Sequence, residues 1–413
     1  MSDWQKIDGG ITAPKGYRAS GIVAGLKPSG APDLALILSD VDAIAAGVFT
    51  TSQVRAACVD YCRQQLQAKP SARAILCNAG QANAGTGEAG WADVYESANT
   101  LAAALNIEPE SILLASTGVI GKRIKMDALK AGIPQLVARA SETGGPDAAG
   151  AIITTDLVTK SIALETKFGD RPVRVGGIAK GSGMIHPNMA TMLAFVTCDA
   201  AVSPPLWQEM LARAANRSFN QITVDGDTST NDSLIALANG QSRTPAITGP
   251  GLEADKLEAM LTAVCEHLAK AIARDGEGAT CLIEVQVSGA ATEEAAAKVA
   301  KTIVGSSLVK SAIFGCDPNW GRIAAAAGRA GVRFDQEKLE ISMGEFQLMK
   351  AGQPLAFDEA AASDYLKRAK TGEYLKEDTV LIRVKIGDEM GFGKAWGCDL
   401  SYDYVKINAE YTT

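Results

Sequence analysis

A Gly/Pro-rich loop runs directly into an apolar segment at residues 180–196, KGSGMIHPNMATMLAFV. Gly181, Gly183 and Pro187 break regular structure and favour tight turns. The five residues after Thr191, Met-Leu-Ala-Phe-Val, form an apolar run of strand length, which predicts a buried strand. We take the rest of the chain to be organised around the bond between Ala190 and Thr191, where this loop meets this strand.

A threonine at such a junction can attack its own preceding carbonyl and move the acyl group from nitrogen to oxygen. Hydrolysis of the resulting ester would leave two chains. The second would begin at Thr191, whose α-amine, with a pKa near ~8, can act as general base for its own hydroxyl. A lone Ala-Thr in a Gly/Pro loop is more often an ordinary start of a strand, so the wider sequence has to decide.

The length and the net charge of the chain limit the classes of protein to which it can belong. With 413 residues and 47% hydrophobic content, the chain can bury a large core, which favours two domains. A net charge of −7 without a Lys/Arg cluster argues against a nucleic-acid or anionic-membrane partner and favours metabolites as ligands. The N-terminus lacks a signal-peptide pattern, and no run approaches the ~20 apolar residues of a membrane span, so we expect a cytoplasmic protein.

Histidine and cysteine usage limits the available chemistry. The eight cysteines are scattered, which indicates buried free thiols and neither a disulfide framework nor a metal site. His186 and His267 are the only histidines, too few for a His-rich site, and we assign neither as a base. The polar stretch at 225–233 lacks the spacing of a calcium loop, so we interpret it as a hydrogen-bonding loop.

Short apolar runs alternate with helical patterns along the chain. Strands are predicted at 20–28, 34–40, 46–51 and 73–80, with a helix over 91–106 and a long amphipathic helix over 253–274. From residue 339 to the C-terminus the pattern indicates mainly strands around one helix. The sequence therefore predicts mixed α/β architecture.

Several motifs accompany the 180–196 segment in a fixed order: STGVIG at 116–121, DGDTSTNDS at 225–233, GEGAT at 276–280, FGCDPNWGRI at 314–323 and INAEYTT at the C-terminus. Together they resemble the ornithine acetyltransferase family, also called the bifunctional glutamate N-acetyltransferase family of arginine biosynthesis, over nearly the whole chain. The resemblance implies two mixed α/β domains of that type. It also implies self-cleavage between Ala190 and Thr191 into an α chain, 1–190, and a β chain, 191–413, which interleave and assemble as two α and two β chains.

The resemblance further implies an acyltransferase that takes an acetyl group from N-acetylornithine onto Thr191 and passes it to glutamate. Thr117 and Gly118 match the oxyanion hole of the family, and Thr154 matches a substrate contact for which Thr155 is the nearest competitor. Lys180 suits a substrate carboxylate and Glu277 a substrate ammonium. Asn408 and Thr413 match binding residues at the C-terminus of the family, and Thr191 itself contacts substrate.

Two alternatives stay open at this point. A self-processing amidohydrolase or aminopeptidase would use the same threonine with water as acceptor, and a silent binding protein would keep the loop uncleaved. No cofactor is expected, and the sequence holds no phosphate-binding loop or dinucleotide fingerprint. Some members of the family also use acetyl-CoA as donor; the sequence leaves this open, and we favour both activities.

Overall fold

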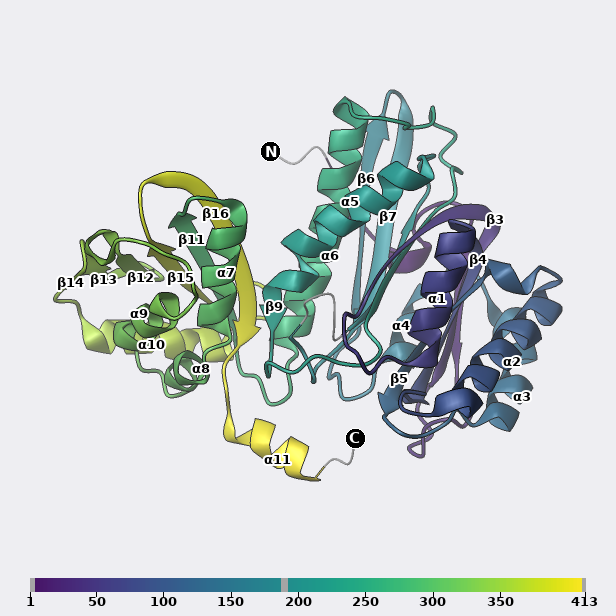
Figure 1. Ribbon diagram of the computed structural model, residues 1–413, viewed down its shortest axis with the longest axis horizontal. Coiled ribbons are helices and arrows are strands. Elements are labelled where there is room, and N and C mark those ends of the chain that lie inside the picture. Colours follow the sequence, from purple (N-terminus) through teal and green to yellow (C-terminus); the bar gives the residue numbers. More distant parts are fainter. Residues whose placement is uncertain (1–3, 187–191, 411–413) are drawn as a thin grey trace.

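The computed structural model describes residues 4–186 and 192–410 and places them in two α/β units that lie side by side (Figure 1). The first unit holds the N-terminal half of the chain together with α5 (Pro204–Arg217) and α6 (Leu252–Arg274). The second holds most of the residues after α6, and β9 (Ile222–Thr223) joins its sheet. The mixed α/β class predicted from the sequence is confirmed.

The first unit is built on a nine-stranded sheet, counted over the described residues, in the order β1-β6-β7-β8-β10-β3-β4-β5, with β2 paired to β3. Pairing is mixed, because β8 is antiparallel to β7 and parallel to β10, and β5 is parallel to β4. The strands are β1 (Gln5–Ile7), β2 (Tyr17–Ile22), β3 (Leu34–Phe49), β4 (Ser71–Gln81), β5 (Ile112–Val119), β6 (Lys160–Phe168), β7 (Arg171–Lys180), β8 (Leu193–Cys198) and β10 (Ser233–Ala238).

β8 shows why the run after Thr191 is apolar throughout. Alternate residues of a strand face opposite sides of a sheet. Phe195 packs into the core on one side, and Val196 into the core on the other, so neither side of β8 is left polar. Four helices contribute to the first core and α5 and α6 to the second; the four are α1 (Ala57–Ala68), α2 (Gly87–Leu105), α3 (Met126–Arg139) and α4 (Gly145–Ile152).

The second unit contains a seven-stranded sheet, again over the described residues, in the order β14-β13-β12-β15-β11-β16-β9. Its own core includes Val285, Ile303 and Ile382. The elements are β11 (Leu282–Gly289), α7 (Glu293–Val304), α8 (Ser307–Phe314), α9 (Trp320–Gly328), β12 (Glu340–Met343), β13 (Phe346–Lys350), β14 (Gln353–Pro354), α10 (Glu359–Thr371), β15 (Thr379–Lys385) and β16 (Glu389–Cys398). All eight cysteines are free and seven are buried, as predicted.

Three sequence predictions of secondary structure differ from the structure. The strand expected at 20–28 ends early, because β2 stops at Ile22. The strands expected at 34–40 and 46–51 form one strand, β3, which stays continuous through an irregularity between Leu38 and Ala43. The C-terminal segment predicted as strand forms a helix, α11 (Tyr402–Glu410). None of its residues is buried, and the Ser401 hydroxyl caps it by accepting the Tyr404 N–H at 3.3 Å.

The predicted cleavage position does not separate the two units. Ala190 and Thr191 lie outside the described residues, but the strands on either side, β7 and β8, are antiparallel neighbours that bring Lys180 opposite Leu193. Residues 1–190 and 191–413 therefore both supply strands to the first sheet. Strand pairing and a shared core would hold the two segments together after a cut.

Candidate functional site

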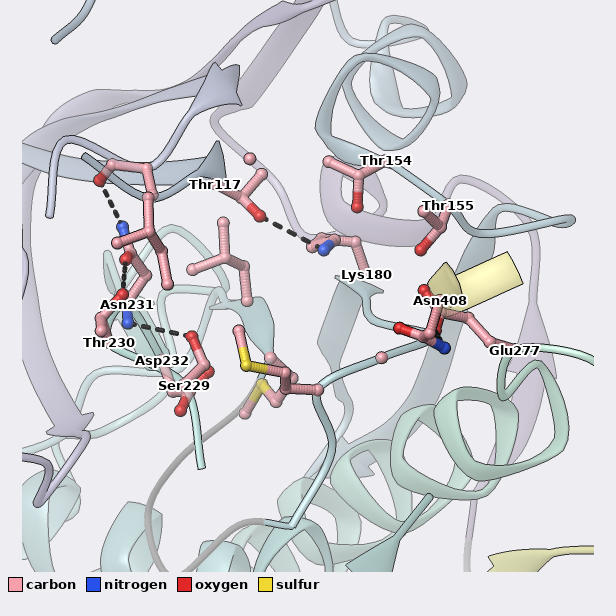
Figure 2. Close-up of a pocket in the computed structure, with 17 residues that line it drawn as sticks. Thr117, Thr154, Thr155, Lys180, Ser229, Thr230, Asn231, Asp232, Glu277 and Asn408 are labelled. Carbon is pink, nitrogen blue, oxygen red and sulfur yellow. Dashed lines mark hydrogen bonds between the residues drawn. The ribbon is translucent and has the colours of Figure 1, made fainter. Parts of the chain in front are cut away.

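One pocket collects most of the residues that the sequence pointed to (Figure 2). It lies at the end of the first sheet where β5 and β7 finish and β8 starts, so three strands deliver side chains to one place. Met192 and Leu193 line it, whereas the predicted residues Ala190, Thr191 and Thr413 lie outside the described residues. The predicted residues that line it are Thr117, Gly118, Thr154, Thr155, Lys180, Glu277 and Asn408.

Thr117 and Gly118 occupy the end of β5, next to β4. Gly118 has a φ of 124°, and a Cβ there would lie 2.3 Å from the carbonyl carbon of Gly80, so only glycine fits. The Lys180 ammonium donates to the Thr117 hydroxyl oxygen at 3.3 Å. Because an ammonium only donates, the Thr117 hydroxyl keeps its own hydrogen for another acceptor. The Thr117 hydroxyl can therefore present a donor to a developing negative charge.

Lys180 brings a positive charge into the pocket at the end of β7. Its side chain is nearly buried, with the residue 6% exposed. Asp156 lies close enough for its charge to matter: burial raises the pKa of the Asp156 carboxyl, but Lys180 and Lys160 outweigh burial and lower it to about 2. The Asp156 carboxylate accepts from the Gly181 N–H at 2.7 Å, which fixes the start of the Gly/Pro loop.

A fully buried lysine anchors this part of the pocket. The Lys160 ammonium lies 2.6 Å from both the Asp156 and Asp275 carboxylates. Asp275 also accepts the backbone N–H of Leu157, and its carbonyl accepts the Ser182 hydroxyl at 2.6 Å. Burial raises the pKa of Asp275, and Lys160 opposes this effect. The network joins the segment after α4, the Gly/Pro loop and the end of α6.

Glu277 supplies a carboxylate at the side of the pocket nearest α11. Its N–H donates to the Ser182 carbonyl at 3.1 Å, and its carboxylate accepts from the Asn408 side chain at 2.8 Å. A Cβ on residue 183 would lie 2.5 Å from this carboxylate, which explains the glycine there. α11 thereby closes one side of the pocket with a residue more than a hundred positions away in sequence.

The wall formed by residues 229–232 was missed as part of the site. The sequence indicated a hydrogen-bonding loop at 225–233, and the structure confirms a loop but places its second half in the pocket. Asn231 holds it there by donating to the carbonyls of Ala82 and Ser116 at 2.6 and 2.8 Å. The signal in the sequence was the dense run of hydroxyls and carboxylates immediately before a buried strand.

Neither histidine lines the pocket. His186 Nδ1 lies 2.9 Å from the Thr223 hydroxyl, and burial, helped by Lys301, lowers its pKa to about 4. Burial also lowers the pKa of His267, in α6, to about 4. Both imidazoles are thus neutral at pH 7, in agreement with leaving them out of the acid–base chemistry.

The choice between Thr154 and Thr155 stays open, because both line the pocket (Figure 2).

Within residues 4–186 and 192–410, no group of three or more His, Cys, Asp and Glu residues could hold a metal ion. No helix in the same ranges is both long and apolar enough to cross a membrane.

We expect Asp156→Asn to lower the free energy of unfolding by about 2 to 4 kcal/mol. Removing one partner from a buried ion pair is costly, although Asp275 still compensates Lys160 in part. Denaturant unfolding at pH 7 gives the value. Because folding lowers the pKa of Asp156 from 3.8 to about 2, the contribution is complete above pH 3.8 and should fade as the pH falls through 2.

The matched control is Asp388→Asn. Asp388 also has a pKa of about 2, next to Lys338 and Lys385, but it is exposed and screened by water. Its replacement should leave stability unchanged within error. Equal losses from the two variants would contradict the anchoring role of the buried network.

The fold and the pocket can be set beside known proteins. A protein from Nostoc sp. named arginine biosynthesis bifunctional protein ArgJ 1 is 79% identical over 413 residues, covering 100% of both chains. A crystal structure of arginine biosynthesis bifunctional protein ArgJ from Bacillus halodurans is 48% identical and covers 54% of this chain and 100% of its own, with a TM-score of 0.50.

A structure of ornithine acetyltransferase from Mycobacterium tuberculosis, complexed with ornithine, is 44% identical and covers 45% of this chain and 98% of its own, with a TM-score of 0.43. The model of the ArgJ family matches residues 18–413. On the strength of that match and of the identity to the Nostoc protein, the chain belongs to the ArgJ family.

Proposed function

We propose that the protein transfers an acetyl group from N-acetylornithine to glutamate through an acetyl ester on Thr191, giving ornithine and N-acetylglutamate. The observation that carries the proposal is the convergence of a donor pair, a cation and a carboxylate in a pocket that reaches Met192, the residue after Thr191. Family membership and the names of the relatives, which refer to arginine biosynthesis, support the choice of substrates.

The first half-reaction would load the enzyme. The Thr191 hydroxyl attacks the acetyl carbonyl, and the Thr191 α-amine takes the hydroxyl proton. Negative charge develops on the carbonyl oxygen, where the Thr117 hydroxyl and the Gly118 N–H can stabilise it. The α-amine then returns the proton to the departing nitrogen, so that ornithine leaves as an amine and the acetyl group stays on Thr191.

The second half-reaction would unload it onto glutamate. The glutamate amine attacks the ester carbonyl, the same donor pair stabilises the oxyanion, and the Thr191 oxygen leaves with a proton. Both amino acids present an α-carboxylate, for which Lys180 is suited, and Glu277 is suited to a substrate ammonium. Asn408, held by its bond to Glu277, would close the pocket together with Thr413, and Thr154 or Thr155 would contact the substrate.

Self-cleavage would have to precede catalysis, because the Thr191 α-amine is free only after the bond to Ala190 is broken. We further propose that an α chain, 1–190, and a β chain, 191–413, stay joined through β7 and β8 and assemble as two of each.

The description of relatives as bifunctional supports a second donor, and we propose that acetyl-CoA can also supply the acetyl group. The proposed partners are therefore small molecules, and the proposed location is the cytoplasm. An amidohydrolase would use the same pocket but release acetate into water. An assay with and without glutamate distinguishes the two, because only a transferase makes N-acetylglutamate.

Intact mass spectrometry tests the proposed cleavage. The protein should yield two chains whose masses sum to the 42.9 kDa precursor plus one water. Thr191→Ala should stay a single chain and be inactive, because it lacks the attacking oxygen. A cleaved Thr191→Ala protein would show that another group attacks the Ala190 carbonyl.

Thr117→Ala should lower kcat by ~10² or more with a smaller effect on KM, because an oxyanion donor acts mainly on the transition state. Thr100→Ala is the matched control, since it removes a hydroxyl that donates to the Glu96 carbonyl of its own helix and does not line the pocket. Steady-state kinetics on cleaved enzyme give both parameters. A rise in KM with an unchanged kcat would show that Thr117 acts in substrate binding and not in catalysis.

A further inference from the structure

Asp232 is a pocket residue that the proposed acetyl transfer leaves without a role. It ends the loop before β10 and lines the same pocket as Thr117 and Lys180, with only 4% of its surface exposed. Its backbone is fixed, because the Asp232 carbonyl accepts the Thr50 N–H at 3.0 Å. The next residue, Ser233, donates its N–H to the Met192 carbonyl at 3.0 Å, which ties this position to the start of β8.

The Asp232 carboxyl group faces the beginning of β8. The Met192 backbone N–H and the Ser229 side chain both hydrogen-bond to it. Its oxygen Oδ2 is buried and has no hydrogen-bond partner in the described part of the chain. Buried polar atoms in folded proteins are normally paired, so an unpaired carboxyl oxygen on a pocket wall indicates an atom kept for a reacting group.

The charge state of this carboxyl suits proton exchange. Burial raises the pKa of Asp232 well above its ordinary value, and the positive charge of Lys180 opposes burial without overcoming it. Burial therefore favours the neutral carboxylic acid over the carboxylate. Such a group offers an O–H donor on one oxygen and an acceptor on the other, so it can give one proton and take another in the same event.

Self-cleavage needs a group of this kind. Before cleavage the nitrogen of Thr191 is an amide nitrogen and cannot act as a base, so the mechanism of the mature enzyme is not available. The hydroxyl must lose a proton, and the nitrogen must gain one before it can leave. His186 and His267 do not line the pocket, and the Glu277 carboxylate is held by Asn408 near α11.

The chain connection from Met192 to Thr191 links Asp232 to the position of the proposed cleavage. Met192 follows Thr191 directly, so the Met192 nitrogen is bonded to the Thr191 carbonyl carbon across a planar peptide unit. A carboxyl that accepts the Met192 N–H is therefore hydrogen-bonded to the peptide unit that joins Met192 to Thr191. Lys180, the other ionisable group near Asp232, is a cation that only donates.

We propose that Asp232 is the acid–base residue of self-cleavage, an inference that rests on the proposed function. The Thr191 oxygen bonds to the Ala190 carbonyl carbon, and its proton passes to one oxygen of the Asp232 carboxyl. The other oxygen gives its proton to the Thr191 nitrogen as the carbon–nitrogen bond breaks. The product is an ester with a free amine, and the carboxyl ends the step as a neutral acid, ready for ester hydrolysis by water.

The test follows the rate of self-cleavage by intact mass in freshly made precursor. Asp232→Asn keeps the shape but cannot exchange the proton, and Asp232→Ala removes the group; both should slow cleavage by ~10² or more, the usual size of acid–base effects. Hydroxylamine, which cuts esters, should not restore cleavage of Asp232→Asn, because the ester has not formed. Restoration by hydroxylamine would overturn the proposed step, since it would place the defect in ester hydrolysis.

Chemical rescue separates proton exchange from packing. Formate should restore part of the cleavage of Asp232→Ala, whereas formamide, of similar size but without the acid, should not. Equal rescue by both, or none by formate in a variant with normal thermal unfolding, would overturn the proposal. If Asp232→Ala does not fold, Asp232→Glu, which retains the acid, must cleave faster than Asp232→Asn for the proposal to stand.

The matched control is Asp225→Asn. Asp225 is a second carboxyl of the same loop whose pKa burial raises, but it accepts the Ile185 N–H and does not line the pocket. An amide oxygen can keep that bond, so cleavage should proceed at the normal rate; slowing equal to that of Asp232→Asn would contradict a specific role. Normal cleavage of Asp232→Asn would overturn this inference alone, because the proposed function is tested separately by Thr191→Ala and by acetylation of the chain beginning at Thr191.

Discussion

The buried contact between Lys160 and the carboxylates of Asp156 and Asp275 is the interaction on which the pocket depends. A lysine with no exposed side-chain surface is stable only if its charge is compensated, and here two carboxylates lie 2.6 Å from it. Each carboxylate also holds backbone N–H groups. One ion cluster therefore sets the positions of the segment after α4, the start of the Gly/Pro loop and the end of α6, which carry Thr154, Gly183 and Glu277.

The same geometry explains how one chain could be cut and stay folded. β7 and β8 are hydrogen-bonded neighbours, and β8 sends alternate side chains into the cores on both faces of the sheet. Breaking a bond in the connection between them would leave these contacts in place. The core that buries β8 is thus also what would keep Met192, the residue after a new N-terminus, in the pocket that Thr117 and Lys180 line.

Local patterns were enough to predict most strands and helices, whereas the residues of the site were predicted from the resemblance to a family. Thr117, Gly118, Lys180 and Glu277 lie in Gly-rich motifs at the ends of regular elements, so a motif in the sequence becomes a wall of the pocket. Long-range contacts were not predictable. Lys160 meets Asp275 from 115 positions away, and the pKa of Asp232 is raised because distant segments bury it. α11 was mistaken for a strand because it buries no side chain and its cap depends on Ser401 alone.

The central claim is that Thr191 carries the acetyl group between two amino acids that occupy one pocket in turn. The most direct measurement is the mass of the chain beginning at Thr191 after incubation with N-acetylornithine alone. A covalent intermediate predicts a gain of about 42 Da, the mass of one acetyl group, lost again when glutamate is added. No acetylated chain, together with intersecting double-reciprocal plots for the two substrates, would indicate direct transfer in a ternary complex and would contradict the account.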